Sequence, residues 1–127
     1  MVPFIHMNAQ LLNSKAHDCV FCKIVSGIIK SDVIKETDGF IVIKDINAVS
    51  PLHLLIISKT HYDSIINTDE VFNGNELLQL IKVISQEFGI DSEGFRIVIN
   101  TGPDGGQTVM HFHAHLMAGR SFSWPPG

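Results

Sequence analysis

Three short runs of β-branched and other apolar residues occupy the first half of the chain. They lie at residues 32–36, 40–44 (FIVIK) and 53–57 (HLLII), and turn-forming residues separate them at 38–39 and 47–51. Short apolar runs bounded by glycine, proline, asparagine and aspartate are typical of β-strands joined by tight connections. The pattern therefore predicts three strands that form a meander.

A helical period replaces this pattern further along the chain. Apolar residues recur every three or four positions at Leu77, Leu80, Ile81, Ile84 and Phe88. Gly89 follows directly and is a frequent type of helix stop. The spacing predicts one amphipathic helix that begins between Thr68 and Asn75 and ends near Phe88.

Shorter segments complete the pattern. Residues 20–27 (VFCKIVSG) predict a turn or two of helix that ends at a glycine, and residues 95–100 and 110–117 predict two further strands joined by a Gly-rich loop. Residues 1–17 have no sustained period, and we interpret them as an extension of a single domain that spans 18–127. Strands in sequence with one long helix predict an α+β fold with a largely antiparallel sheet, covered on one face.

The composition limits the classes of partner. The 127 residues are 45% hydrophobic, which is enough for one modest core. The formal net charge is -4 and no block of lysine and arginine occurs, so we expect no polymeric nucleic acid as a partner. No apolar run approaches the roughly 20 residues of a membrane helix, and no secretory signal pattern is visible at the start. We therefore expect a cytoplasmic protein that does not bind membranes.

The segment HFHAHLM, residues 111–117, carries the most specific chemistry. Because side chains alternate across a strand, His111, His113 and His115 should share one face, about 6.5 to 7 Å from one to the next, while the apolar residues pack on the helix. Neighbouring imidazoles disfavour each other's protonation, so at least one should keep a free nitrogen lone pair. A neutral imidazole is a competent nucleophile.

Three interpretations of these histidines are open: exposed side chains without a function, a His-x-His metal site, and nucleophilic catalysis. The preceding segment NTGPDGGQT, residues 100–108, favours the third. Its glycines can present backbone N–H groups, and Gln107 and Thr108 add side-chain donors, which together can form a cradle for phosphate oxygens. A nucleophile beside such donors is the arrangement that phosphoryl or nucleotidyl transfer requires.

Two cysteines, Cys19 and Cys22, are separated by two residues. In a reducing compartment this spacing favours a metal clip or a redox pair over a structural disulfide. Two unrelated thiols near the start of a helix are the alternative.

The motif HFHAHLM resembles that of the histidine triad (HIT) family, in which His-x-His-x-His precedes two apolar residues. Residues 44–62 (KDINAVSPLHLLIISKTHY) are similar to the family's Asp-containing turn and the strand that opens with a fourth active-site histidine. The ending WPPG resembles nucleoside phosphoramidase-type histidine triad nucleotide-binding proteins. The resemblance covers about residues 18–127 and implies an α+β, HIT-like fold of about five strands in a two-subunit assembly.

The resemblance also implies roles for individual residues. His113 would be the nucleophile that forms a covalent nucleotidyl-histidine, His115 would contact the phosphate oxygens, and His53 would assist. Asp45 would hold the ribose hydroxyls. Further contacts would come from Phe21, Ile24, Ile43 and Ile46 around the base, and from Asn100, Gly106, Gln107 and Thr108 around the phosphate and leaving group. Thr108 stands where relatives usually have serine, which leaves the leaving-group preference open.

A metal site and a dimer follow from the same resemblance. Zinc-binding relatives pair such cysteines with two histidines that match His61 and His111, which implies a closed, structural Cys2His2 zinc site. No catalytic cofactor is expected. Members of this type are homodimers in which the C-terminal tail reaches toward the partner's site, and Trp124 is the residue expected to make that contact.

The implied activity is hydrolysis of P–N bonds, with P–O bonds as a second type, to nucleoside 5′-monophosphates, with purines preferred. Histidine rather than glutamine at position 115 favours hydrolysis over transfer of the nucleotide to a sugar phosphate. A dinucleoside polyphosphate hydrolase is the rival within the enzyme class, and the WPPG ending argues against it. The same residues would also suit a nucleotide-binding or scaffolding module with vestigial catalysis, or a metallohydrolase that uses the three histidines as ligands.

Overall fold

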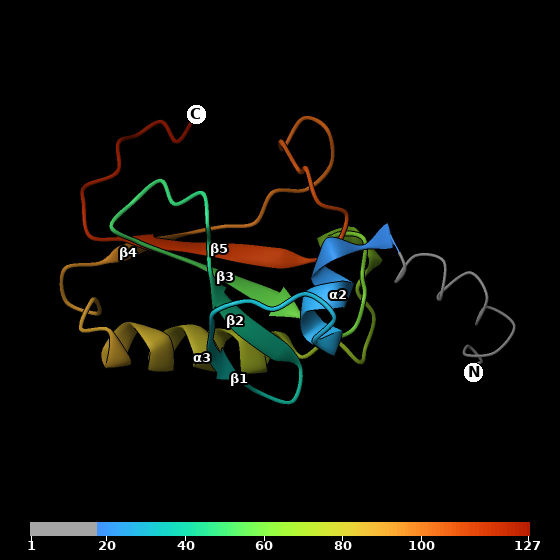
Figure 1. The fold of residues 1–127 in the computed structure, drawn as a ribbon. Coiled ribbons are helices and arrows are strands. Elements are labelled where there is room, and N and C mark those ends of the chain that lie inside the picture. Colours follow the sequence, from blue (N-terminus) through green and yellow to red (C-terminus); the bar gives the residue numbers. More distant parts are fainter. Residues whose placement is uncertain (1–17) are drawn as a thin grey trace, which may run out of the picture.

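The computed structural model describes residues 18–127, so the expected extension at 1–17 lies outside the described residues. The elements are α2 (Val20–Ser26), β1 (Val33–Glu36), β2 (Phe40–Lys44), β3 (Leu52–Ser58), the 3-10 helix η1 (Ile65–Asn67), α3 (Gly74–Glu87), β4 (Phe95–Val98) and β5 (His113–Ala118) (Figure 1). These elements form the α+β fold that the sequence predicts. Among the described residues, the helices are all too short or too polar to cross a bilayer.

The five strands form one antiparallel sheet in the order β1-β2-β3-β5-β4. The first three follow one another as the predicted meander. After α3, however, the chain enters the sheet at its far edge as β4 and returns inward as β5. The histidine strand β5 therefore lies between β3 and β4, with His113 opposite Ile57 and His115 opposite Leu55.

The long helix α3 packs on one face of the sheet and begins and ends within the predicted limits. Its first turn is capped by the side chain of Asn73, which accepts a hydrogen bond from the Glu76 N–H at 2.9 Å. Its apolar stripe, which includes Leu77, Leu80 and Ile84, packs against strand residues such as Leu116. This contact forms the larger of two buried clusters.

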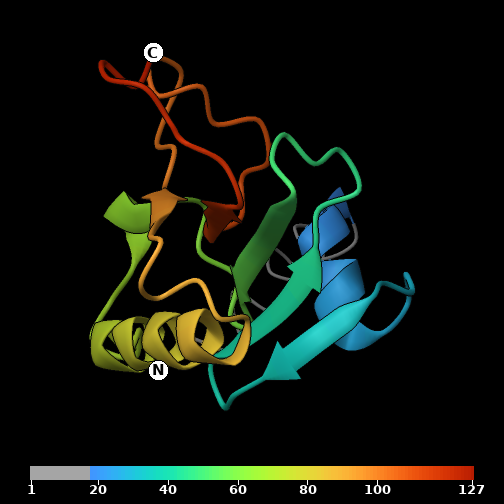
Figure 2. The ribbon, with the colours of Figure 1, turned by 90° about the vertical axis from the view of Figure 1, so that its left-hand side faces the viewer.

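The short helix α2 covers part of the opposite face, whereas the sequence predicts a sheet covered on one face only. Phe21 of α2 packs with Ile41, Ile43, Leu55 and Ile57 in the second buried cluster. Figure 2 shows α3 and α2 on opposite sides of the strands. Side chains on β5 therefore point alternately toward α3 or toward α2.

The expected strand at 110–117 is shorter than predicted, because β5 begins at His113. The N–H of His111 donates to the Val109 carbonyl at 2.9 Å, which is a tight turn rather than a strand pairing. Its imidazole, moreover, donates through Nε2 to the Ser58 carbonyl at 2.7 Å. His111 thus lies just before the strand, and the prediction that it continues the strand is wrong.

Candidate active site and metal centre

His113 and His115 project from β5 on the α2 side of the sheet, with ring centroids 5.2 Å apart. Between and beyond them, Ala114 and Leu116 are fully buried in the cluster beneath α3. This is the division into a chemical face and an apolar face that the alternating sequence predicts for a strand. The strand therefore holds two of the three histidines beside each other, above a packed core.

The hydrogen bonds of His113 fix which of its nitrogens is free. Nδ1 lies 2.8 Å from the main-chain carbonyl oxygen of His111. A carbonyl can only accept, so Nδ1 carries the hydrogen and the lone pair of the neutral ring lies on Nε2. Phe21 packs edge-on against the ring with centroids 4.9 Å apart, which restrains its orientation.

A second chain of hydrogen bonds reaches His115. The Val49 N–H donates to His53 Nδ1 at 3.1 Å, so the hydrogen of the neutral His53 ring lies on Nε2. That nitrogen is 2.9 Å from His115 Nδ1 and 3.3 Å from an Asp45 carboxylate oxygen. His115 therefore accepts through Nδ1 and keeps its own hydrogen on Nε2, where it is a donor.

Burial favours the neutral form of two imidazoles, those of His111 and His115. It lowers the pKa of His111 to about 4, with smaller contributions from His61 and His113. Burial likewise lowers the pKa of His115, and the neighbouring His113 and His53 add to the effect. For His111 and His115, desolvation is thus the larger cause of the lowered pKa, and the repulsion between adjacent imidazoles that the sequence predicts is the smaller one.

A cavity of about 410 Å³ opens beside the histidine pair. The predicted residues that line it are Phe21, Ile24, Ile43, Asp45, Ile46, Asn100, Thr108, His113 and His115. Lys30 and Lys44 also line it, and sequence reasoning missed both because single lysines carry no motif. The cavity combines an apolar wall, a carboxylate, two imidazoles and two cationic side chains, which together suit an anionic ligand with an apolar ring.

Gln107 and Gly106 do not line this cavity, although both were expected at the phosphate. The Gln107 amide donates to the Asp63 carbonyl at 2.6 Å and to the Val109 carbonyl at 3.0 Å, and it accepts from the Gly102 N–H at 3.0 Å. The buried Gln107 side chain therefore holds the Gly-rich loop in shape. These contacts support a structural role for Gln107 and do not support the predicted role as a donor to the phosphate.

Two further predicted residues also lie outside the cavity lining. His53 reaches the site through its contacts with His115 and Asp45, both of which line the cavity. Trp124 is 82% exposed and lies with Arg96, Arg120 and Phe122 beside a different hollow. The structure contains one chain, so the contact of Trp124 with a second subunit stays a prediction.

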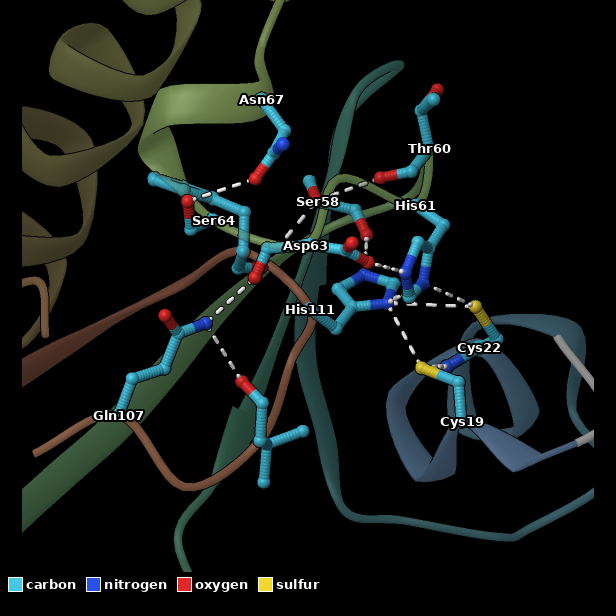
Figure 3. Close-up of polar contacts among 12 residues, drawn as sticks. Cys19, Cys22, Ser58, Thr60, His61, Asp63, Ser64, Asn67, Gln107 and His111 are labelled. Carbon is cyan, nitrogen blue, oxygen red and sulfur yellow. Dashed lines mark hydrogen bonds and ion pairs between the residues drawn. The ribbon is translucent and has the colours of Figure 1, made fainter. Parts of the chain in front are cut away.

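Four predicted metal ligands converge on one point (Figure 3). Cys19 Sγ and His61 Nδ1 lie 3.2 and 3.1 Å from His111 Nδ1, and Cys22 Sγ lies 3.2 Å from His61 Nδ1. The edges of a tetrahedron around zinc with two sulfur and two nitrogen ligands are roughly 3.3 to 3.8 Å. The four donor atoms are thus nearly at the spacing that a tetrahedral ion requires.

The outer partners of the two histidines also fit a metal. His61 Nε2 contacts an Asp63 carboxylate oxygen at 2.8 Å, and His111 Nε2 contacts the Ser58 carbonyl at 2.7 Å. Both rings therefore carry their hydrogen on Nε2 and direct their Nδ1 lone pairs toward each other and toward the two sulfur atoms, an arrangement that suits a cation among the four donor atoms. Burial and the adjacent Cys19 raise the pKa of the Cys22 thiol to about 12, so a metal must displace its proton.

The fold and the site together define a small α+β protein in which one sheet strand presents histidines to a cavity of about 410 Å³. Comparison with known proteins then identifies the family. The protein-family model described as HIT domain matches residues 26–122 of the sequence. The chain therefore belongs to the histidine triad family.

Three similar proteins illustrate the range of the match. A 14 kDa zinc-binding protein of Brassica juncea is 41% identical, over 87% of this chain and 100% of the relative. Adenylylsulfatase HINT1 of Arabidopsis thaliana is 39% identical, over 85% of this chain and 76% of the relative. The crystal structure of a HIT family hydrolase from Legionella pneumophila superposes with a TM-score of 0.77 at 38% identity and covers 87% of this chain and 100% of that one.

Proposed function

We propose that the protein hydrolyses phosphorus bonds to a nucleoside 5′-monophosphate, and P–N bonds in particular, with His113 as the nucleophile. The hydrogen bond from His113 Nδ1 to the His111 carbonyl carries the proposal, because it leaves the Nε2 lone pair on a ring that lines the cavity. Phe21, Ile24 and Ile43 supply an apolar wall for a base, for which we propose a purine, and Asp45 supplies an acceptor for ribose hydroxyls.

The reaction has two steps. His113 Nε2 forms a bond to the α-phosphorus while the bond from phosphorus to the leaving nitrogen breaks, and the leaving amine takes up a proton from solvent. A water molecule then attacks the phosphorus of the nucleotidyl-histidine and loses a proton to solvent. The bond from phosphorus to Nε2 breaks, so the nucleoside monophosphate leaves and the neutral imidazole is restored. His115, with its hydrogen on Nε2, donates to a non-bridging oxygen as negative charge grows there.

The names of two relatives support hydrolysis at such a site. The Arabidopsis relative is named an adenylylsulfatase and the Legionella structure a hydrolase. The first name also supports an adenylyl substrate. Thr108 also lines the cavity, and its extra methyl relative to serine is expected to affect which leaving groups the site accepts.

The substitution His113→Ala tests the proposal. It should lower turnover of an adenosine phosphoramidate by at least about three orders of magnitude, because no other group replaces the nucleophile. Binding of AMP, measured by calorimetry, should change by less than about ten-fold, since Phe21 and Asp45 are untouched. Rapid acid-free quenching of the unmodified protein should reveal a nucleotide adduct on the peptide that contains His113.

The outcomes separate the proposal from its rivals. Substantial turnover by the His113→Ala protein would refute the nucleophile. A faster rate on a diadenosine polyphosphate than on the phosphoramidate would favour the dinucleotide hydrolase, and tight AMP binding without any turnover would favour a binding module. Loss of activity after metal removal, with the fold intact, would favour a metallohydrolase.

We also propose that Cys19, Cys22, His61 and His111 hold a structural zinc ion. The convergence of two thiols and two Nδ1 lone pairs supports it, as does the similarity to a protein named for zinc binding. Zinc there would join α2 to the turn before β5, and its four protein ligands would leave no open position for substrate. In this proposal the nucleophile and the donor to the phosphate oxygen are therefore histidines of β5 and not the metal.

A further inference from the structure

We propose that Arg120 is a positioning residue of the active site, which acts through the main chain of Val49 to hold His53. The inference rests on the proposed function, since it concerns the histidine that supports His115. Arg120 follows β5 in the chain and does not line the cavity.

The contact starts at the carbonyl of Val49. Arg120 donates to this oxygen from both Nε and Nη2, each at 3.2 Å. The N–H of the same residue donates to His53 Nδ1 at 3.1 Å. One residue of the connection between β2 and β3 is thus held on one side by a guanidinium and on the other by the active-site imidazole.

Apolar burial does little to hold this connection. Ile46 is 93% exposed and Val49 is 58% exposed, so neither side chain anchors residues 45–51 in the core. The connection instead rests on the turn after β5, where Gly119 approaches Pro51 so closely that an added Cβ would lie 2.7 Å from the proline side chain. Contacts from Gly119 and Arg120 therefore determine where the Val49 amide points.

The direction of that amide determines which nitrogen of His53 carries hydrogen. With Nδ1 accepting from Val49, the His53 hydrogen lies on Nε2 and can be donated to His115 Nδ1, 2.9 Å away. His115 then presents its own Nε2–H as a donor. If the Val49 amide turned away, His53 could hold its hydrogen on Nδ1. His115 Nδ1 would then lose the hydrogen bond from His53 that keeps the His115 hydrogen on Nε2.

The chain offers a matched control for Arg120. Arg120 and Arg96 both lie over the Phe122 ring, at 4.3 and 5.2 Å from its centroid, and both donate to main-chain carbonyls of the C-terminal segment. Arg120 also donates to Val49, whereas Arg96 Nη2 donates to the Ser123 carbonyl. Arg120→Met removes the donors and keeps an apolar stem, Arg120→Lys restores a donor, and Arg96→Met removes the neighbouring arginine.

The test combines steady-state kinetics on an adenosine phosphoramidate with nitrogen NMR of the full chain. Arg120→Met should lower kcat about ten-fold with KM within about two-fold, because a fixed donor is lost rather than a binding contact. The His53 ring signals should shift from the Nε2–H form toward a mixture, and the Val49 amide should exchange faster. Arg96→Met should resemble the unchanged protein, and Arg120→Lys should recover part of kcat.

Two results would overturn the inference. One is an Arg120→Met protein whose His53 tautomer and Val49 exchange match those of the unchanged protein. The other is an equal loss in Arg96→Met, which would indicate a general effect on the C-terminal segment. If the unchanged protein shows no turnover at all, the proposed function fails, and the NMR comparison still decides the role of Arg120.

Discussion

Main-chain groups determine the chemistry of three histidines in this protein. The Ser58 carbonyl fixes the hydrogen of His111, the His111 carbonyl fixes that of His113, and the Val49 amide fixes that of His53. Sequence reasoning identified all three side chains from their spacing and from family resemblance. It could not find these partners, because every residue has a carbonyl and nearly every residue an amide, so the sequence carries no signal for them.

Gln107 illustrates the same limit for side chains. Its position in a Gly-rich loop before the histidines favours a phosphate donor, and an amide is chemically suited to that role. In the structure, however, the Gln107 residue is 8% exposed and its amide is bonded to Asp63, Gly102 and Val109. Whether a polar side chain turns toward a ligand or inward depends on the unsatisfied carbonyls around it, which only the folded loop defines.

The zinc proposal gives a prediction about one residue, Cys22. Protein purified without chelator should contain about one zinc per chain, and Cys22→Ser should lower the affinity by more than the roughly 10- to 100-fold that loss of an outer partner costs. Affinity should also fall in acid, because the thiol pKa of about 12 means that binding releases a proton. Metal analysis and competition with a chromophoric chelator measure both effects.

A chain that contains no zinc, with two thiols that react freely, would contradict the site. Tetrahedral cobalt offers an independent check, since its visible absorption reports thiolate ligands. Lys23→Ser is the control, because it adds a serine at the next position of α2 without changing a proposed ligand.

At the level of elements, local patterns predicted most boundaries well. The apolar stripe and the glycine stop placed α3, and the apolar runs placed β1, β2 and β3. The order of the last two strands was not predictable in this way, because a local pattern does not indicate which strands will be neighbours in the sheet. The start of β5 differs from the prediction: His111 lies before the strand, where its imidazole is hydrogen-bonded to the Ser58 carbonyl, a contact that the local pattern does not indicate.

Glu76 gives a prediction about how α3 is joined to the sheet. Its carboxylate accepts hydrogen bonds from the Gly39 N–H at 2.8 Å and from the Thr37 hydroxyl, both in the turn between β1 and β2. Glu76→Ala leaves these donors without their partner and should lower the free energy of unfolding by about 1 to 3 kcal/mol. Denaturation in urea, followed by circular dichroism, measures the change.

Glu87→Ala is the matched control on the same helix. Glu87 pairs with Lys35 at 3.1 Å, but its side chain is half exposed, so the loss should be below about 1 kcal/mol. Equal losses for the two variants would show that Glu76 does no more than an ordinary surface charge.

At the scale of the whole molecule, the site joins segments that are far apart in the sequence. Cys19 and Cys22 meet His61 and His111, and Asp45 meets His53 and His115. Local periodicity contains no information about such meetings. The resemblance to the histidine triad family predicted the Cys/His set and assigned Asp45, His53 and His115 to one site. The contacts of Asp45 with His53 and His115, and all distances and directions, come from the structure.

The two-subunit assembly stays a prediction, and the structure offers two features that support it. Trp124 is 82% exposed, although a large aromatic side chain gains stability when it is covered, and β4 lies at the edge of the sheet with one side unpaired within the described chain. Sedimentation equilibrium at micromolar concentration should give twice the chain mass of 14.0 kDa. A mass of one chain across that range would contradict the dimer.

The two-sided character of β5 has a consequence for how the gene tolerates mutation. Residues 113 and 115 face the cavity, whereas Ala114 and Leu116 are sealed under α3. In a library of single substitutions, even-numbered positions of this strand should yield little folded material. Positions 113 and 115 should instead accumulate normal amounts of folded but inactive protein. Alternate positions of β5 would thus differ in whether a substitution abolishes folding or abolishes activity.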